Sequence, residues 1–176
     1  DTLVVTVMSN IGLKKRMTEL GINVAETKVG DRYVLEEMLK EGYSIGGEQS
    51  GHVIFLDKNT TGDGMLTAIQ VLDVMKSTGR RMSALANDIP IYPQVLVNVI
   101  VDNEIKHQAM EDHDLWQRIR EVEGKLGSSG RVLVRASGTE PIIRVMLEGQ
   151  NTDEISDCAI YIVKVLEQKY KGKIRV

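Results

Sequence analysis

Residues 3–27 read LVVTVMSNIGLKKRMTELGINVAET. The run Leu3–Val7 is apolar and rich in β-branched residues, which is typical of a strand buried on both faces of a parallel sheet. Asn10 is suited to cap the helix that follows, and Gly21 to end it. The apolar side chains between them recur at helical spacing, at Leu13, Met17 and Leu20. Because residues 22–27 return to an extended pattern, the stretch predicts a β-α-β unit.

The same alternation continues to about residue 79. A second helix is predicted from Gly30-Asp31 to Gly42, with its apolar stripe at Val34, Leu35, Met38 and Leu39. Two short strands follow at 43–47 and 52–56. A third helix, capped by Asp63, extends to Lys76 and is closed by Gly79. Strands and helices in this order favour an α/β fold with a mainly parallel sheet.

The pattern changes around Asn87. Pro90 and Pro93 bracket a short extended piece, so we expect a boundary within residues 83–89 and domains at 1–85 and 86–176. The second domain shows the order β-α-β-β-α, which predicts a small two-layer α/β sandwich with an antiparallel sheet. Its elements are expected at 94–101, 112–126, 131–135, 142–147 and 153–170.

Composition excludes several classes of function. Of the 176 residues, 42% are hydrophobic and 27% charged, and 22 Lys and Arg against 25 Asp and Glu leave a net charge of −3. Such a balance argues against a non-specific nucleic-acid or membrane-surface binder. No apolar run approaches the roughly 20 residues of a membrane span. Cys158 is the sole cysteine, which fits a reducing cytoplasm.

Residues 135–141, RASGTEP, form the first candidate site. Ser, Gly and Thr at the end of a strand leave backbone N–H groups free to converge on one anion, and Arg135 can contact two oxygens at once. Arg144, on the next strand, shares a face with apolar residues and could point back to the same anion. The pattern favours a phosphate site, and the alternative is a tight Ser-Gly hairpin with two surface arginines.

A second candidate is Gly46–His52, GGEQSGH. If this stretch is extended, Glu48, Ser50 and His52 project to one side and suit sugar hydroxyls, with His52 as a proton carrier. The alternative is a polar turn between two strands. A third stretch, residues 27–32, contains Gly30 and Asp31, and its charges are equally explained by helix capping. Residues 60–64 resemble an acidic metal loop but supply one carboxylate, so no metal site is predicted.

The two loops taken together resemble the α-D-phosphohexomutases. GEQSGH at 47–52 is similar to the sugar-binding loop of that family, and RASGTEP with Arg144 to its C-terminal phosphate-binding loop. The Gln49 form of the loop, VGDRYV at 29–34 and VMSN at 7–10 are similar to the bacterial members that act on glucosamine phosphates. The resemblance implies a four-domain protein, of which this chain is most of a three-layer α/β third domain and all of a fourth domain related to the TATA-binding-protein fold. The abrupt apolar start agrees with a fragment.

The resemblance also implies a reaction and a role for each loop. Glucosamine 6-phosphate and glucosamine 1-phosphate, precursors of UDP-N-acetylglucosamine and peptidoglycan, would interconvert through a phosphoserine and a glucosamine 1,6-bisphosphate intermediate. The serine and the Mg²⁺ loop belong to the upstream domains, so the chain alone is expected to be inactive.

Glucose or mannose phosphates are the alternative substrates, and a stand-alone phosphosugar-binding module is the alternative class. Besides the phosphosugar, the implied partners are the N-terminal domains, with a homodimer left open. The implied site residues are Glu48 and Ser50 for the sugar, Gly30 and Asp31 for the adjacent wall, His52 for proton transfer or orientation, and Arg135, Ser137, Gly138, Thr139 and Arg144 for phosphate.

Overall fold

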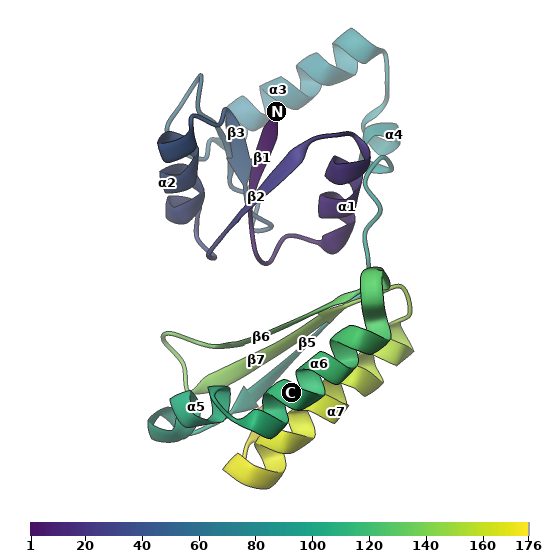
Figure 1. The fold of residues 1–176 in the computed structure, drawn as a ribbon. Coiled ribbons are helices and arrows are strands. Elements are labelled where there is room, and N and C mark those ends of the chain that lie inside the picture. Colours follow the sequence, from purple (N-terminus) through teal and green to yellow (C-terminus); the bar gives the residue numbers. More distant parts are fainter. Residues whose placement is uncertain (176) are drawn as a thin grey trace. The chain divides into compact units, whose positions relative to one another are not determined.

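The computed structural model describes residues 1–175, and the chain divides into two compact units, residues 1–91 and 92–176. Each unit has its own sheet and its own hydrophobic core. The first unit contains β1 (Thr2–Thr6), α1 (Ile11–Glu19), β2 (Asn23–Thr27), α2 (Asp31–Glu41), β3 (Ile45–Gly47), β4 (Val53–Phe55), α3 (Gly64–Thr78) and α4 (Met82–Ala86) (Figure 1).

The predicted β-α-β unit is confirmed. The sheet has the order β2-β1-β3-β4, in which β1 pairs in parallel with both β2 and β3, and β4 returns antiparallel to β3. Asn10 caps α1, since its side chain accepts a hydrogen bond from Gly12 N at 2.9 Å. The helices α1 and α2 cover opposite faces of this sheet (Figure 1), as right-handed crossovers to either side of β1 require.

Two apolar stripes of this unit are less buried than their spacing suggests. Val34 and Met38 of α2 pack in the core against Val4, but Leu39 is 58% exposed, because it lies on the far side of the helix. In the part of the chain that the structure describes, no residue of α3 is buried. Several of its apolar residues face solvent, among them Met65, Ile69 and Leu72.

The boundary between the units falls after Ile91, a few residues beyond the expected division at 85/86. A short helix, α4, occupies residues that were expected to begin the linker. Arg80 holds this helix to α3, because its guanidinium donates to both carboxylate oxygens of Asp88, at 2.6 and 2.7 Å, and to Ala84 O at 2.9 Å. These contacts keep residues up to Asp88 with the first unit.

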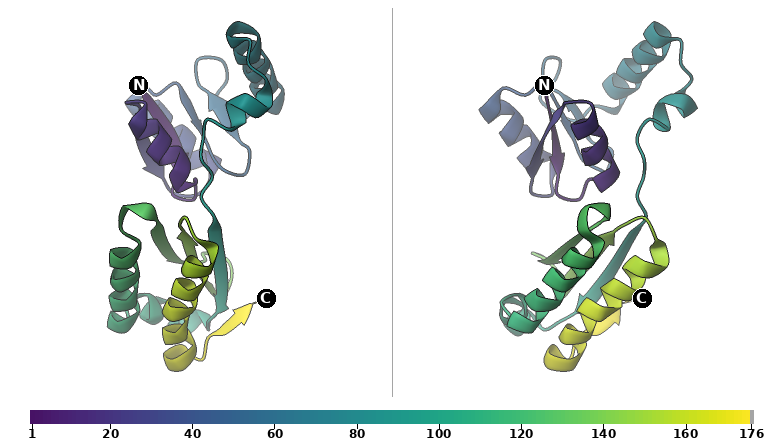
Figure 2. Two further views of the ribbon diagram at one scale, coloured as in Figure 1. Left: turned by 90° about the vertical axis from the view of Figure 1, so that its right-hand side faces the viewer. Right: turned by 45° about the vertical axis from the view of Figure 1, so that its right-hand side comes forward.

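The second unit is the predicted two-layer sandwich. Its sheet has the order β6-β7-β5-β8 and every pairing is antiparallel. Helices α6 and α7 lie side by side over one face (Figure 2). The elements are β5 (Gln94–Ile100), α5 (Asn103–Met110), α6 (His113–Leu126), a 3-10 turn at Gly127–Ser129, β6 (Arg131–Ala136), β7 (Ile142–Glu148), α7 (Thr152–Tyr170) and β8 (Lys173–Arg175).

Two elements of this unit were not predicted. β8 has three residues, too few for a period to show. α5 has eight residues, of which most are polar, and it is defined by the Asp102 side chain, which caps it by accepting from Glu104 N at 3.2 Å. It buries Ala109 and Lys106, and Ile105 and Met110 pack against the core, but three apolar residues in a short polar helix give little periodic signal.

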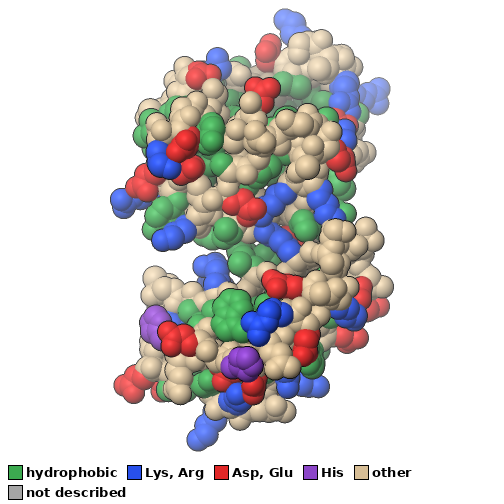
Figure 3. Space-filling model, viewed as in Figure 1, with side chains coloured by type: hydrophobic (Ala, Val, Ile, Leu, Met, Phe, Trp, Pro, Cys, Tyr) green, Lys and Arg blue, Asp and Glu red, His purple; other side chains and the backbone are tan. Residues whose placement is uncertain are grey.

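The surface agrees with the near-neutral composition. Basic and acidic side chains are both spread over the visible face of each unit (Figure 3). Among residues 1–175, no helix has the length and apolar character needed to cross a membrane.

Candidate functional site

Glu48, Ser50 and His52 meet in the first unit, at the connection between β3 and β4. The Ser50 hydroxyl donates to Glu48 Oε1 at 2.6 Å and lies 3.0 Å from His52 Nδ1. Because its one hydrogen goes to the carboxylate, Ser50 accepts from His52, which places a proton on Nδ1 and leaves Nε2 as the acceptor of the neutral ring. His52 Nδ1 is also 3.3 Å from Glu48 Oε1. The Glu48 side chain is 11% exposed and the His52 ring 54%.

The backbone here follows the alternative that the sequence left open. Glu48–Gly51 is a polar turn between two strands, in which Gly51 N donates to Glu48 O at 3.0 Å. Gly51 has a φ of +98°, a conformation that other residues rarely adopt. Glu48 N donates to His52 O at 3.0 Å and closes the hairpin. The three side chains therefore converge around a turn, and not along one face of a strand.

Gly30 and Asp31 lie at the N-terminus of α2, where Gly30 has a φ of +131°. Asp31 Oδ1 accepts from the backbone N of Arg32 at 2.8 Å, which is a capping contact. This loop and the Glu48 turn follow β2 and β3, so both lie at the carboxyl edge of the sheet, where α/β proteins place their ligands. β1 lies between these strands, so the two loops start about 10 Å apart.

A cavity of about 340 Å³ lies beside the Glu48 turn. Most of its lining is aliphatic, from Leu3, Val5, Leu13, Ile45 and Val53, with polar side chains from Ser9, Asn10, Glu48 and Gln49. Such a lining suits an apolar group better than a phosphosugar, and we assign it no part in the site.

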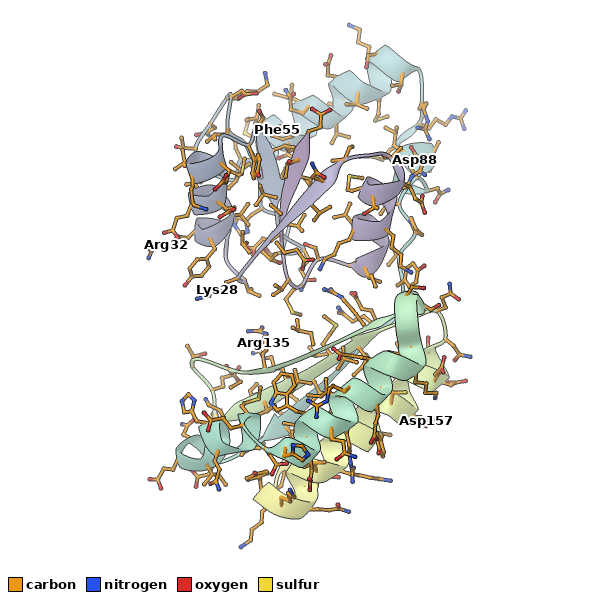
Figure 4. All side chains as sticks on the ribbon, viewed as in Figure 1. Lys28, Arg32, Phe55, Asp88, Arg135 and Asp157 are labelled. Atoms are coloured by element: carbon orange, nitrogen blue, oxygen red, sulfur yellow. The ribbon has the colours of Figure 1, made fainter. Side chains whose placement is uncertain are left out.

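The second cluster lies in the other unit, where β6 ends and β7 begins. Arg135 and Arg144 are directly opposite each other in the β6–β7 pairing. Asn98 and Arg175 continue the same row across β5 and β8. The row lies on the sheet face opposite α6 and α7, and Figure 4 shows the Arg135 side chain on that side. Three basic side chains therefore share one face of this sheet.

The two facing arginines differ in their partners. Arg144 Nη2 donates to Glu140 Oε2 at 2.8 Å, and Arg175 Nη1 donates to Glu140 Oε1 at 3.0 Å. The hydrogen bonds from Arg175 and Arg144 hold the pKa of Glu140 below its usual range. Within residues 1–175, Arg135 has no ion pair or hydrogen-bond partner, and its Nε is buried. Burial and, next to it, the charge of Arg144 lower the pKa of Arg135.

The loop between the strands presents backbone groups beside these arginines. Ser137 is buried, its N donates to Ile142 O at 2.9 Å, and its hydroxyl accepts from Glu140 N at 3.2 Å. Gly138 and Thr139 are exposed, and neither has a hydrogen-bond partner in the described chain. Two free N–H groups and two hydroxyls thus adjoin an unpaired guanidinium, as an anion site requires.

Sequence analysis missed Lys106, which lies under this loop. Its Nζ donates to Ser137 O at 2.6 Å, to Glu140 O at 3.0 Å and to Asn103 Oδ1 at 3.1 Å. The residue is 7% exposed. The one available signal was a lysine in a short polar segment, which normally indicates a solvated surface.

Two facts define the class of this protein: an α/β unit with polar loops at the carboxyl edge of its sheet, and a two-layer unit with an arginine-lined loop. Residues 1–92 match the family model described as phosphoglucomutase/phosphomannomutase, alpha/beta/alpha domain III, and residues 96–165 match the model of the C-terminal domain of the same family. The chain belongs to this phosphohexomutase family.

Its relatives are similar over nearly the whole chain. The phosphoglucosamine mutase of Alkaliphilus oremlandii is 57% identical over 169 residues, and that of Clostridium tetani 54% over 171. These alignments cover 96% and 97% of this chain but 38% of each relative. The chain thus spans about two fifths of the length of the curated relatives that it matches.

Solved structures agree on the fold. The N-acetylphosphoglucosamine mutase of Aspergillus fumigatus has a TM-score of 0.79 at 19% identity, covering 94% of this chain and 38% of that one. A phosphoglucomutase/phosphomannomutase family protein from Burkholderia thailandensis has a TM-score of 0.72 at 20% identity, covering 99% and 39%. Identities this low establish the architecture alone.

Proposed function

We propose that this chain supplies the sugar-binding and phosphate-binding loops of an enzyme that interconverts glucosamine 6-phosphate and glucosamine 1-phosphate. The reaction is suggested by relatives of 53–57% identity that are named phosphoglucosamine mutase. The upstream domains of a polypeptide of the relatives' length would carry the phosphoserine. A glucosamine 1,6-bisphosphate intermediate would turn around between two phosphoryl transfers.

The observation that carries the proposal is the unpaired Arg135 opposite Arg144. Two guanidiniums side by side repel each other, so the pair is stabilised when an anion lies between or beside them. Gly138 supports this assignment: an added Cβ would meet no described atom within 4 Å, and its φ is not positive, so neither packing nor backbone geometry demands glycine there. Close approach of a phosphate would demand it.

In this function, Arg135, Ser137, Gly138, Thr139 and Arg144 hold the phosphate that does not react. When the phosphate dianion binds, Arg144 would either give up its hydrogen bond to Glu140 or contact Glu140 and the phosphate at the same time. A dianion with several oxygens matches two guanidiniums and the N–H groups of the loop, whereas a sugar hydroxyl does not.

The Glu48 turn would contact the sugar. Glu48 accepts hydroxyl or ammonium hydrogens, and Ser50 holds the carboxylate in place. His52 keeps Nε2 free as an acceptor when neutral, which suits a proton carrier or an orienting contact. Gly30 and Asp31 would line the neighbouring wall of the same sheet edge.

The family resemblance also implies Mg²⁺. The resemblance places the Mg²⁺ ligands in the upstream domains, and we propose that they lie there. Among residues 1–175, no three His, Cys, Asp or Glu side chains gather as a metal site. We further propose a cytoplasmic location, which a single cysteine favours. A homodimer is a separate proposal, tested by the mass of the protein in solution.

The test is an assay of the protein extended to the length of its relatives. With Mg²⁺ and glucosamine 1,6-bisphosphate supplied, we expect faster conversion of glucosamine 6-phosphate than of glucose or mannose 6-phosphate. Higher kcat/KM for glucose or mannose phosphates would instead favour a phosphoglucomutase or phosphomannomutase. Phosphosugar binding without any turnover would favour the stand-alone binding module.

A further inference from the structure

Lys106 is a buried cation with no catalytic role assigned to it. It belongs to α5, and its ammonium reaches residues 31 and 34 positions further along the chain. A lysine is rarely 7% exposed, because taking an ammonium out of water costs free energy unless every N–H is satisfied. Here three acceptors satisfy the three donors of the ammonium: Ser137 O, Glu140 O and Asn103 Oδ1.

All three acceptors are neutral oxygens. In residues 1–175, Lys106 has no carboxylate partner, and the nearby Glu140 carboxylate is already paired with Arg144 and Arg175. The positive charge beneath the loop is therefore not neutralised locally. An uncompensated cation in a site of low dielectric attracts an anion more strongly than one at the surface.

The two carbonyls bonded by Lys106 belong to the first and last residues of the turn Ser137–Glu140. When both carbonyls point down at the ammonium, the peptide groups between them are held in one orientation. The exposed members, Gly138 and Thr139, lie between these two anchored positions. Ser137 O and Gly138 N–H belong to the same planar peptide group, so the contact with Lys106 directs the Gly138 N–H away from the ammonium.

We propose that Lys106 is a positioning residue of the phosphate loop: it holds both ends of the Ser137–Glu140 turn in the anion-binding form and adds an unneutralised charge beneath it. This inference rests on the function proposed above, because it takes the loop to bind phosphate. Lys106 itself does not contact the phosphate.

The experiment titrates the ¹⁵N-labelled chain with inorganic phosphate and follows the amide resonances of Gly138 and Thr139. Lys106→Met keeps the length of the side chain and removes the ammonium. We expect the phosphate dissociation constant to rise about tenfold, because the turn loses both of its carbonyl anchors and the charge beneath it. Amide shifts of Gly138 and Thr139 should also differ from wild type before phosphate is added.

Lys125→Met is the matched control, since it removes one positive charge from the same unit at a half-exposed side chain paired with Glu154. We expect it to change phosphate affinity less than about threefold, because a distant surface charge is screened. If Lys106→Met weakened binding no more than Lys125→Met, the proposal would be wrong. If the wild-type amides did not respond to phosphate at all, the phosphate loop itself would be wrong.

Lys106→Met could fail to fold, so a measurement on the wild-type chain is also decisive. Three hydrogen bonds should slow exchange of the ammonium protons and make the Lys106 ¹⁵Nζ resonance observable. We expect phosphate to shift this resonance while leaving that of Lys125 in place. A Lys106 ¹⁵Nζ resonance that stays fixed while the Gly138 and Thr139 amides respond would overturn the proposal.

Discussion

Arg135 and Arg144 occupy directly opposed positions on β6 and β7, an arrangement that costs stability in the absence of a counterion. Glu140 pairs with both Arg144 and Arg175, and within the described residues the Arg135 side chain is left unpaired. In the proposed function, this placement sacrifices stability for the ability to bind phosphate, which is the usual relation between a binding site and its fold.

Arg135→Ala should therefore separate function from stability in this chain. We expect phosphate or glucosamine 6-phosphate to bind about ten- to a hundredfold more weakly, because charge-assisted contacts contribute roughly 1.5–3 kcal/mol each. The thermal midpoint without ligand should stay the same or rise, since a repulsive pair is removed. Titration calorimetry and thermal melts measure the two effects.

Arg118→Ala is the control for this substitution. Arg118 donates to Tyr161 O at 2.6 Å and stacks over the Tyr161 ring at 4.6 Å, away from the loop. The substitution Arg118→Ala should lower the thermal midpoint and leave the affinity for phosphate unchanged. Wild-type affinity in Arg135→Ala would favour the reading of residues 135–141 as a simple hairpin turn.

A second prediction at the residue scale concerns Glu48 and the sugar. In the intact enzyme proposed above, Glu48→Gln keeps the size of the side chain but removes the charge that makes it a strong acceptor. Because the bisphosphate presents similar hydroxyls in both orientations, forward and reverse rates should fall alike, and glucosamine substrates should suffer at least as much as glucose ones. Initial rates in both directions measure this.

Glu36→Gln provides the comparison, because Glu36 is half exposed and, among residues 1–175, pairs with Arg32 of the same helix alone. The forward and reverse initial rates of the Glu36→Gln variant should match those of the wild type. A loss confined to one direction in Glu48→Gln would mean that Glu48 is not a contact shared by the two orientations.

At the N-terminus of α6, one side chain both caps the helix and contacts a second helix. Asp112 caps it through Asp114 N and Leu115 N, and also accepts from Tyr170 and Lys169 of α7. Burial alone would raise the pKa of Asp112, but the hydrogen bonds from Tyr170, Lys169 and Leu115 outweigh it and lower the pKa to about 2. The ionised carboxylate therefore joins the two helices of this unit.

A lowered pKa means that this stabilisation is present above pH 3.8, the ordinary value, and is lost as the pH falls through about 2. Asp112→Asn keeps a capping oxygen but removes the charge. We expect it to destabilise the second unit by about 1–2 kcal/mol at pH 7, and the difference from wild type to shrink between pH 4 and pH 2. Urea unfolding followed by the fluorescence of Trp116, the one tryptophan of the chain, reports on α6 directly.

Asp114→Asn is the control, because it removes an exposed carboxylate from the same end of α6. Asp114 is 54% exposed and also pairs with Lys169. Its loss should cost less than about 1 kcal/mol, since exposed pairs are weak. An equal effect of the two substitutions would show that the buried Asp112 carboxylate contributes no more than an exposed ion pair.

Helices α3 and α7 represent the two extremes of burial. α7 buries seven side chains along its inner face, whereas α3 exposes Met65, Ile69 and Leu72. Amide hydrogen exchange should be slowest in the centre of α7 and much faster throughout α3, because local opening of α3 uncovers little apolar surface. Comparable protection of the two helices would contradict this account.

On the scale of the whole chain, each unit contributes one of the two proposed binding loops. Glu48, Ser50, His52, Gly30 and Asp31 belong to the α/β unit, and the phosphate loop belongs to the antiparallel unit. Neither set includes the serine that would carry the phosphoryl group in the proposed reaction. The chain is thus assigned binding and orientation, and the transfer step is assigned elsewhere.

We therefore expect the purified 176-residue chain to form no glucosamine 1-phosphate from glucosamine 6-phosphate. The assay would include Mg²⁺ and glucosamine 1,6-bisphosphate, with product measured through UDP-N-acetylglucosamine formation. The same assay on the protein extended to the length of its relatives is the positive control. Turnover by the chain alone would refute the assignment of the phosphoryl carrier to the upstream domains.

Local features of the sequence determined most of the secondary structure. Asn10 and Asp63 cap helices as predicted, and the glycines at 42 and 79 end them as predicted. Caps and apolar periods act within a few residues, so they can be recognised without knowledge of packing. The two candidate loops were found for the same reason, since each is contiguous in sequence.

Tertiary structure alone decided which groups meet. The register of β6 with β7 sets Arg135 against Arg144, and the Glu48–Gly51 turn brings Ser50 between Glu48 and His52. Lys106 reaches a loop 31 residues away because α5 packs against that end of the sheet. These contacts join residues that are distant in sequence or separated by a turn, and their geometry depends on how whole elements pack, which no local pattern of side chains encodes.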